Sequence, residues 1–191
     1  MPIQYTNKKG QIFYLHQGTT KTGKPKYFFS MKGDGILVDE VPDGFEIHET
    51  PNAQVFLRRI EPAIITDSEK TIVEEGMKIY SKLKYYQIEI KKNKIIIFQA
   101  DQNIDNLSEL FGSMPNIKQE NLVKMLTRSI SYSPMMRFVL IDKVTREFQV
   151  ERYCFLGRVD DWIVIDAMGQ LQKLVKKYVK HLGQESYYEL F

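Results

Sequence analysis

The first sixty residues are interrupted every few positions by turn-forming residues, and this spacing restricts the folds open to the chain. Between Gln4 and Ile60, short runs rich in aromatic and β-branched residues alternate with Gly, Pro, Asn and Asp. Such runs, bounded by turn residues, are typical of strands. We therefore predict a β-rich module over residues 1–61, a small meander of about five strands. The clearest strands expected in it are 11–16, 26–31, 45–49 and 55–60.

Residues 62–191 combine helical and strand patterns, and Pro62 marks the joint. Thr66 and Glu69 have the spacing of a capping box, and Asp166 is expected to cap the last helix. Apolar periodicity predicts helices over 67–83, 117–130 and 167–182. Strands are predicted over 86–91, 94–100, 138–142, 147–155 and 162–166. The expected fold class is α+β: a mixed or antiparallel sheet backed by about three helices, packed with the N-terminal module.

Composition predicts a globular protein of a reducing compartment. Apolar residues make up 43% of the 191 positions and charged residues 27%, which is ordinary for a chain that buries a core. Cys154 is the single cysteine, so no intrachain disulfide can form. The longest apolar runs are four residues, and the N-terminus lacks the apolar stretch of a signal peptide. We therefore expect a soluble cytoplasmic protein with no membrane partner.

The charge of the N-terminal module is divided along its length. Residues 1–32 carry six lysines and no acidic residue, whereas residues 33–60 carry six acidic residues and two arginines. The net charge of the whole chain is only +3, which does not by itself imply a polyanionic partner. The two halves of the module could neutralise each other once folded.

Gly18, Gly23 and Lys24 match the G-x-x-x-x-G-K pattern of a phosphate-binding loop. A true loop of this kind opens a helix and has Ser or Thr after the lysine, to bind the metal ion. Here Pro25 occupies that position, and the β-forming residues 26–30 follow it. The match is therefore interpreted as a hairpin turn.

The same hairpin, residues 18–30, has the composition of a nucleic-acid contact. Lysines neutralise phosphates and exposed aromatic rings stack on unpaired bases, so Lys21, Lys24, Lys26 and Tyr27 are the candidate binding residues. The alternative is that the aromatic residues belong to the core and the lysines are merely solvated. The leading hypothesis is a non-catalytic binding protein whose partner is nucleic acid or another protein. The aromatic tail, including Tyr187 and Tyr188, is a candidate for docking on another subunit.

The enzymatic alternative is a metal-dependent phosphodiesterase or nuclease. Glu89 and Lys91 have the E-x-K spacing that places a carboxylate and an ammonium group on one face of a strand. No aspartate precedes them on a neighbouring strand, and the pair could simply be the solvent face of a hairpin. The three histidines and Cys154 lack ligand spacing, so no metal or cofactor is predicted.

Residues 10–60 resemble a recurrent stretch of bacterial proteins of unknown function. The pieces that carry the resemblance are TGKPKYFFS, VDEVPDGFEIHE and NAQVFLRR. The resemblance implies that this stretch is a structural unit from a bacterial source. It implies no activity and no site residues.

Overall fold

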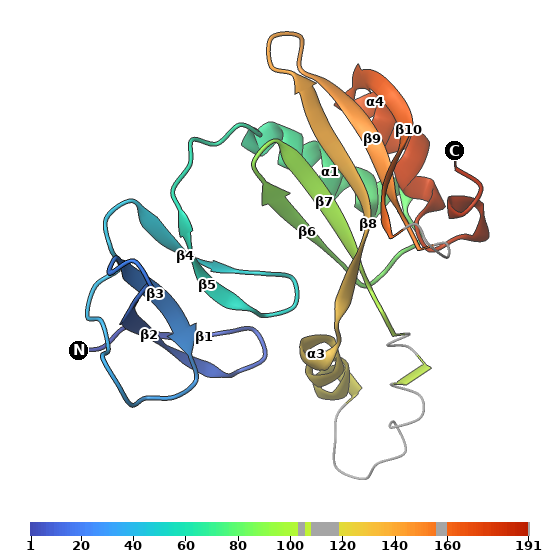
Figure 1. The fold of residues 1–191 in the computed structure, drawn as a ribbon. Coiled ribbons are helices and arrows are strands. Elements are labelled where there is room, and N and C mark those ends of the chain that lie inside the picture. Colours follow the sequence, from blue (N-terminus) through green and yellow to red (C-terminus); the bar gives the residue numbers. More distant parts are fainter. Residues whose placement is uncertain (103–105, 108–118, 156–159, 191) are drawn as a thin grey trace. The chain divides into compact units, whose positions relative to one another are not determined.

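The computed structural model describes residues 1–102, 106–107, 119–155 and 160–190. They form three sheets of antiparallel strands together with helices, which confirms the α+β class (Figure 1). The chain divides into two compact units. The first contains Met1–Pro62 and Asp105–Ile130, and the second contains Ala63–Ile104 and Ser131–Phe191. Within the described residues, no helix has the length and apolar character that a membrane span requires.

In its described residues, the first unit contains five strands in two sheets, rather than one meander. The strands are β1 (Gln4–Thr6), β2 (Ile12–Thr19), β3 (Pro25–Ser30), β4 (Phe45–Glu49) and β5 (Val55–Arg59). The first three form one antiparallel sheet, and β4 pairs only with β5. Helix α3 (Gln119–Ser129) belongs to the same unit, and residues 117–118 of its predicted range lie outside the described residues.

Side-chain hydrogen bonds connect β1 and the turn after it to the β4–β5 hairpin. The buried amide of Asn7 donates from Nδ2 to the carbonyl oxygen of Ala53 at 2.9 Å. The hydroxyl of Tyr5 donates to Glu49 Oε2, also at 2.9 Å. These bonds join chain segments more than forty residues apart. They explain how two small sheets, neither of which could bury a core alone, form one unit.

The second unit is built on a five-stranded antiparallel sheet in the order β10-β9-β8-β7-β6. Its strands are β6 (Tyr86–Lys91), β7 (Lys94–Ala100), β8 (Tyr132–Asp142), β9 (Glu147–Cys154) and β10 (Asp161–Gln170). Strands that follow one another in the sequence are neighbours throughout this sheet, including β7 and β8, which are separated by residues 101–131. The turn at Lys92-Asn93 joins β6 to β7, as the sequence predicts.

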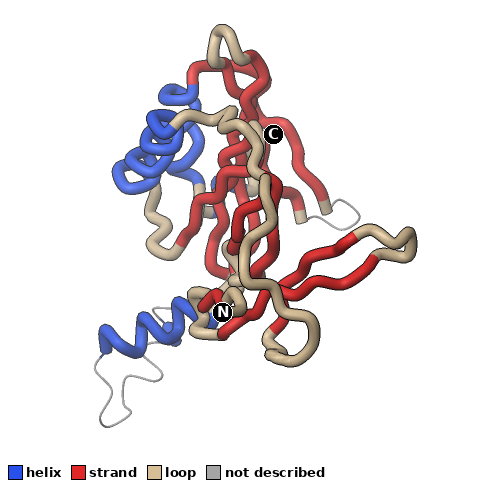
Figure 2. The backbone as a smooth tube through the Cα atoms, turned by 90° about the vertical axis from the view of Figure 1, so that its left-hand side faces the viewer, coloured by secondary structure: helices blue, strands red, loops and turns tan. Residues whose placement is uncertain are grey.

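Two helices lie against the same face of this sheet (Figure 2). They are α1 (Asp67–Tyr80) and α4 (Leu171–Tyr178), and two short 3-10 segments, η1 (Val179–His181) and η2 (Glu185–Tyr187), follow α4. Their apolar residues pack on alternate residues of the strands. The resulting core includes Val73, Met77, Ile95, Ile97, Phe138, Phe148, Val150, Leu174 and Leu182.

Gly76 of α1 packs directly against Val175 of α4. A Cβ atom built on this glycine would lie 2.0 Å from Cγ1 of Val175. Real Cβ atoms essentially never come within 3 Å of a neighbouring heavy atom. The contact between the two helices therefore requires a residue without a side chain at position 76.

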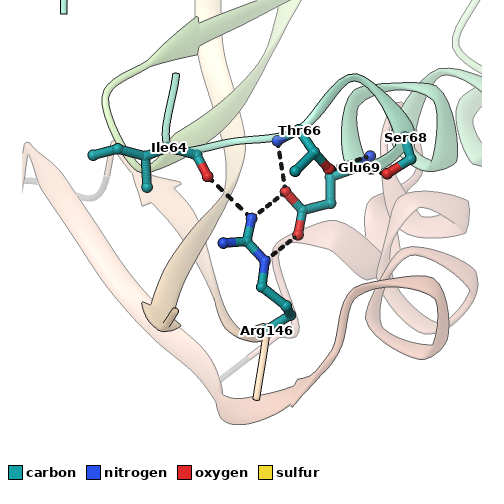
Figure 3. Close-up of polar contacts among 5 residues, drawn as sticks. All are labelled: Ile64, Thr66, Ser68, Glu69 and Arg146. Carbon is teal, nitrogen blue, oxygen red and sulfur yellow. Dashed lines mark hydrogen bonds and ion pairs between the residues drawn. The ribbon is translucent and has the colours of Figure 1, made fainter. Parts of the chain in front are cut away.

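The first turn of α1 is held to the β8–β9 turn by Arg146 (Figure 3). The guanidinium of Arg146 donates from Nε to Glu69 Oε1 at 2.8 Å and from Nη2 to Glu69 Oε2 at 2.5 Å. Nη2 also donates to the carbonyl oxygen of Ile64 at 3.0 Å. Glu69 simultaneously accepts from the backbone N–H of Thr66 at 2.8 Å, completing the predicted capping box. One carboxylate thus serves both the helix cap and an ion pair across the unit.

The prediction that Asp166 caps the last helix is wrong. Strand β10 continues past it to Gln170, because pairing with β9 persists as far as Glu147, and α4 begins at Leu171. The carboxylate of Asp166 instead accepts hydrogen bonds at Oδ2 from the hydroxyl of Tyr178, at 2.8 Å, and from Lys177 Nζ, at 3.1 Å. Burial raises the pKa of Asp166, but these hydrogen bonds outweigh it and leave the pKa below its ordinary value.

The aromatic tail does not present Tyr187 for docking on another subunit. Tyr187 is only 1% exposed and belongs to the core of the second unit. Its hydroxyl donates to the carbonyl oxygens of Met135, at 2.5 Å, and Tyr153, at 3.1 Å. Tyr188 is exposed. Through Tyr187, the tail therefore packs on strands β8 and β9 of its own unit.

Candidate functional site

The stretch 18–30 forms a β-hairpin with a short, well-bonded turn. Thr19 pairs with Pro25, and the backbone N–H of Thr20 donates to the carbonyl oxygen of Lys24 at 2.8 Å. The hydroxyl of Thr20 also bonds the backbone of Lys24, and Gly23 has a φ of +78°, a conformation that favours glycine. No helix follows this turn, since β3 begins at Pro25. The interpretation of the glycine-lysine motif as a hairpin turn is confirmed.

The hairpin separates two of the residues that the sequence analysis grouped together. Lys26 pairs with Gly18, and Phe28 pairs with His16, on one face. Tyr27 lies on the other face, which is the face of the fully buried Leu15. Lys26 therefore shares its face with Phe28 and not with Tyr27.

Phe28 is the aromatic residue that the sequence analysis missed. Its side chain is 42% exposed, and its ring stacks on that of His16 at a centroid separation of 5.3 Å. The period-two alternation of strand residues could have identified it, because Lys26 and Phe28 are two positions apart. Together with Lys21 and Lys24 in the turn, these two side chains form an exposed surface, here called the hairpin surface.

The lysines of the hairpin surface are not neutralised by direct ion pairs. Lys21, Lys24 and Lys26 are exposed, and in the described part of the chain none of them lies within ion-pair distance of a carboxylate. The acidic residues that do form ion pairs in this unit use other partners. Glu46 pairs with Arg58 at 2.7 Å, and Asp39 pairs with the terminal amino group. The expected neutralisation of the basic half does not take place through the hairpin lysines.

The second candidate site is a hollow of about 430 Å³ on the sheet of the second unit. Ile95 and Ile97 point toward the helices, so Ile96 and its cross-strand neighbours Glu89 and Arg137 point to the opposite face. That face carries the hollow. Its lining residues are Glu89, Lys91, Lys92, Asn93, Lys94, Ile96, Phe98, Pro134, Arg137 and Trp162.

Glu89 and Lys91 therefore share one face of β6, as the E-x-K spacing predicts, but their surroundings are basic. Among the described residues, Glu89 is the only carboxylate that lines the hollow. Within the described residues, no group of three His, Cys, Asp or Glu side chains has a metal-binding arrangement. A two-carboxylate metal site of the kind used by phosphodiesterases is not assembled around Glu89 by these residues.

Arg137 and Trp162 are the residues of the hollow that the sequence analysis missed. The guanidinium of Arg137 lies over the indole ring of Trp162, 4.2 Å from its centroid, and Nε donates to Glu151 Oε2 at 2.6 Å. These residues come from β8, β9 and β10, so no sequence spacing could have connected them. Their proximity depends on the strand order and register of the sheet.

No family model, curated protein or solved structure matches this chain. The function is therefore argued from the two surfaces just described.

Proposed function

We propose that the protein is a non-catalytic nucleic-acid-binding protein that contacts the phosphate backbone through the hairpin surface. The observation that supports this most is the state of Lys21, Lys24 and Lys26: they are exposed on one short hairpin and have no carboxylate partner in the described chain. When exposed lysines neutralise the phosphates of a nucleic acid, they release the counterions that were bound there. This release is the main source of sequence-independent affinity for nucleic acids.

The exposed ring of Phe28 favours a single-stranded ligand over a duplex. An aromatic ring beside lysines can stack on an unpaired base while the ammonium groups hold the neighbouring phosphates. Phe28 lies on the same face as Lys26, and stacking on His16 fixes its ring. Three lysine contacts to a single strand would give a salt slope, d log K/d log[salt], of about −2.

The test is binding of a labelled, mixed-sequence single strand of about twenty nucleotides, followed by fluorescence anisotropy at low salt. Lys24→Glu is expected to weaken binding by about tenfold or more, because it removes one phosphate contact and adds a repulsive charge. Lys173→Glu is the matched control, since this exposed lysine lies on α4 in the second unit and its substitution changes the net charge equally.

Two outcomes would contradict the proposal. One is the absence of binding by the wild-type chain at low salt. The other is an equal effect of Lys24→Glu and Lys173→Glu, which would mean that only net charge matters. A Phe28→Ala variant adds a further check, because it is expected to reduce affinity for single strands more than for a duplex of the same length.

The enzymatic alternative, a phosphodiesterase that uses Glu89 and Lys91, stays a prediction. It is tested by incubating the chain with single-stranded DNA or RNA and Mg²⁺ or Mn²⁺. Cleavage that is lost in Glu89→Ala would support it, whereas the absence of cleavage, or cleavage that survives in Glu89→Ala, would remove it. The single carboxylate of the hollow gives this alternative less support than the binding function has.

A further inference from the structure

We infer that the hollow on the sheet of the second unit is a separate contact site for single-stranded nucleic acid. The inference shares the ligand class of the proposed function, but it rests on different residues and does not depend on the hairpin surface. Its elements are a fixed stacking surface made by Arg137 and Trp162, and a group of lysines at the β6–β7 turn.

The stacking surface is held in place before any ligand arrives. Glu151 accepts from Arg137 through both Nε and Nη2, and Gln149 Nε2 donates to the other carboxylate oxygen of Glu151 at 2.8 Å. Tyr153 contacts the indole of Trp162 edge-on, with the ring centroids 5.1 Å apart. Bases that are not paired stack well on aromatic rings and on guanidinium planes, so a rigid pair of both is suited to them.

The charge of the hollow is complementary to phosphate. Of the described residues that line it, Lys91, Lys92, Lys94 and Arg137 are cationic and only Glu89 is anionic. In the described chain, the three lysines form no ion pair. Arg137 is already balanced by Glu151, so the lysines are the groups available to phosphates and Arg137 contributes mainly its flat surface.

The dimensions of the hollow favour a strand of nucleic acid over a single nucleotide. Lys94 lies on β7 and Trp162 on β10, which are three strand positions apart in the sheet. With about 4.8 Å between neighbouring strands, β7 and β10 are about 14 Å apart, and the two residues are also displaced along the strands. A base on Trp162 and a phosphate at Lys94 would therefore belong to different nucleotides of one strand. A duplex does not fit this arrangement, because its bases offer no free faces for stacking.

The experiment uses the fluorescence of Trp162, which is the only tryptophan in the chain. Titration of the full chain with an unlabelled single strand of about eight nucleotides is expected to quench this fluorescence in a saturable way. Lys94→Glu and Lys92→Glu are expected to weaken the quenching titration by about fivefold or more each, because each reverses the charge of one phosphate contact. Lys173→Glu, which reverses an exposed charge on α4, is expected to leave it within twofold of wild type.

Four results would overturn the inference. The first is that no single strand quenches the fluorescence of Trp162. This result would overturn the inference even if anisotropy shows binding at the hairpin surface. Equal loss from Lys173→Glu and Lys94→Glu would also overturn it, because only net charge would then matter. Saturation by a mononucleotide with the affinity of the eight-nucleotide strand would show that the ligand is a nucleotide. Equal quenching by a poly-glutamate peptide would show a site for acidic protein segments. Circular dichroism of each variant checks that a weakened titration does not reflect unfolding.

Discussion

Replacement of Arg146 tests whether the link between α1 and the β8–β9 turn stabilises the second unit. Arg146→Ala removes two charge-assisted hydrogen bonds to Glu69 and one hydrogen bond to the carbonyl oxygen of Ile64. A hydrogen bond to a charged group contributes about 1.5–3 kcal/mol, and solvent reduces this at Arg146, whose side chain is one-third exposed. We expect the free energy of unfolding to fall by about 2–3 kcal/mol.

The backbone conformation of Arg146 allows a second substitution, which separates the loss of side-chain contacts from the relief of backbone strain. Its φ is +55°, in the left-handed region that costs a residue with a side chain about 1–2 kcal/mol relative to glycine. Arg146→Gly should therefore be less destabilising than Arg146→Ala. Lys92 has the same φ of +55° in the exposed turn between β6 and β7, but it makes no such link, so Lys92→Gly should be neutral or stabilising.

The assay is equilibrium unfolding in urea, followed by the fluorescence of Trp162. Because Trp162 is the only tryptophan and belongs to the second unit, its signal reports that unit and not the first. A loss of 2–3 kcal/mol corresponds to a midpoint shift of roughly 1–2 M urea for a domain of this size. The reasoning is refuted if Arg146→Ala leaves the midpoint unchanged, or if Arg146→Gly and Lys92→Gly shift it equally.

The same link makes the second unit sensitive to acid. Burial acts to raise the pKa of Glu69, but hydrogen bonds from Arg146 and Thr66 outweigh it, so the folded-state pKa lies below the ordinary value of 4.5. A carboxyl group with a lowered pKa stabilises the fold fully above its unfolded pKa, and this contribution is lost as pH falls through the folded pKa. We expect stability measured below pH 4.5 to fall less steeply in Glu69→Gln than in wild type.

Two further predictions concern packing in the same unit. Gly76→Ala is expected to cost about 1–3 kcal/mol or more, because its Cβ would lie 2.0 Å from Val175 Cγ1. Adding Val175→Ala should recover part of this loss in a double-mutant cycle, and additive effects would contradict the reasoning. Tyr187→Phe is expected to cost about 1–3 kcal/mol, because it leaves the carbonyl oxygens of Met135 and Tyr153 without this donor. An unchanged urea midpoint would show that these carbonyls find other partners.

Features that depend on neighbours in the sequence were predictable from the sequence alone. The capping box of Thr66 and Glu69 follows from their three-residue separation at the start of an amphipathic helix. The strands predicted over 86–91 and 94–100 coincide with β6 and β7, because strand patterns arise from residues that are close in the sequence. Pro25 and the β-forming residues after it were enough to identify the hairpin turn.

Local patterns failed where two structures were compatible with the same residue. Asp166 fits the start of a helix by type and position, but pairing with β9 extends the strand past it and α4 begins at Leu171. The strands of the first unit were predicted in roughly the right places. Their division into two sheets could not be predicted from periodicity, and neither could the long-range hydrogen bonds, such as that from Asn7 to Ala53, that join these sheets.

The sequence by itself therefore determined the α+β class, most of the strands and the position of the hairpin, whereas the exposure of its lysines came from the structure. The tertiary structure decided which distant side chains meet. Glu69 and Arg146 are 77 positions apart, and the hollow unites Glu89, Arg137 and Trp162 from three different strands. The physical reason is that turns, caps and strand alternation arise from neighbouring residues. Strand order and helix packing are instead set by the free energy of burying the whole core, and only they bring such residues together.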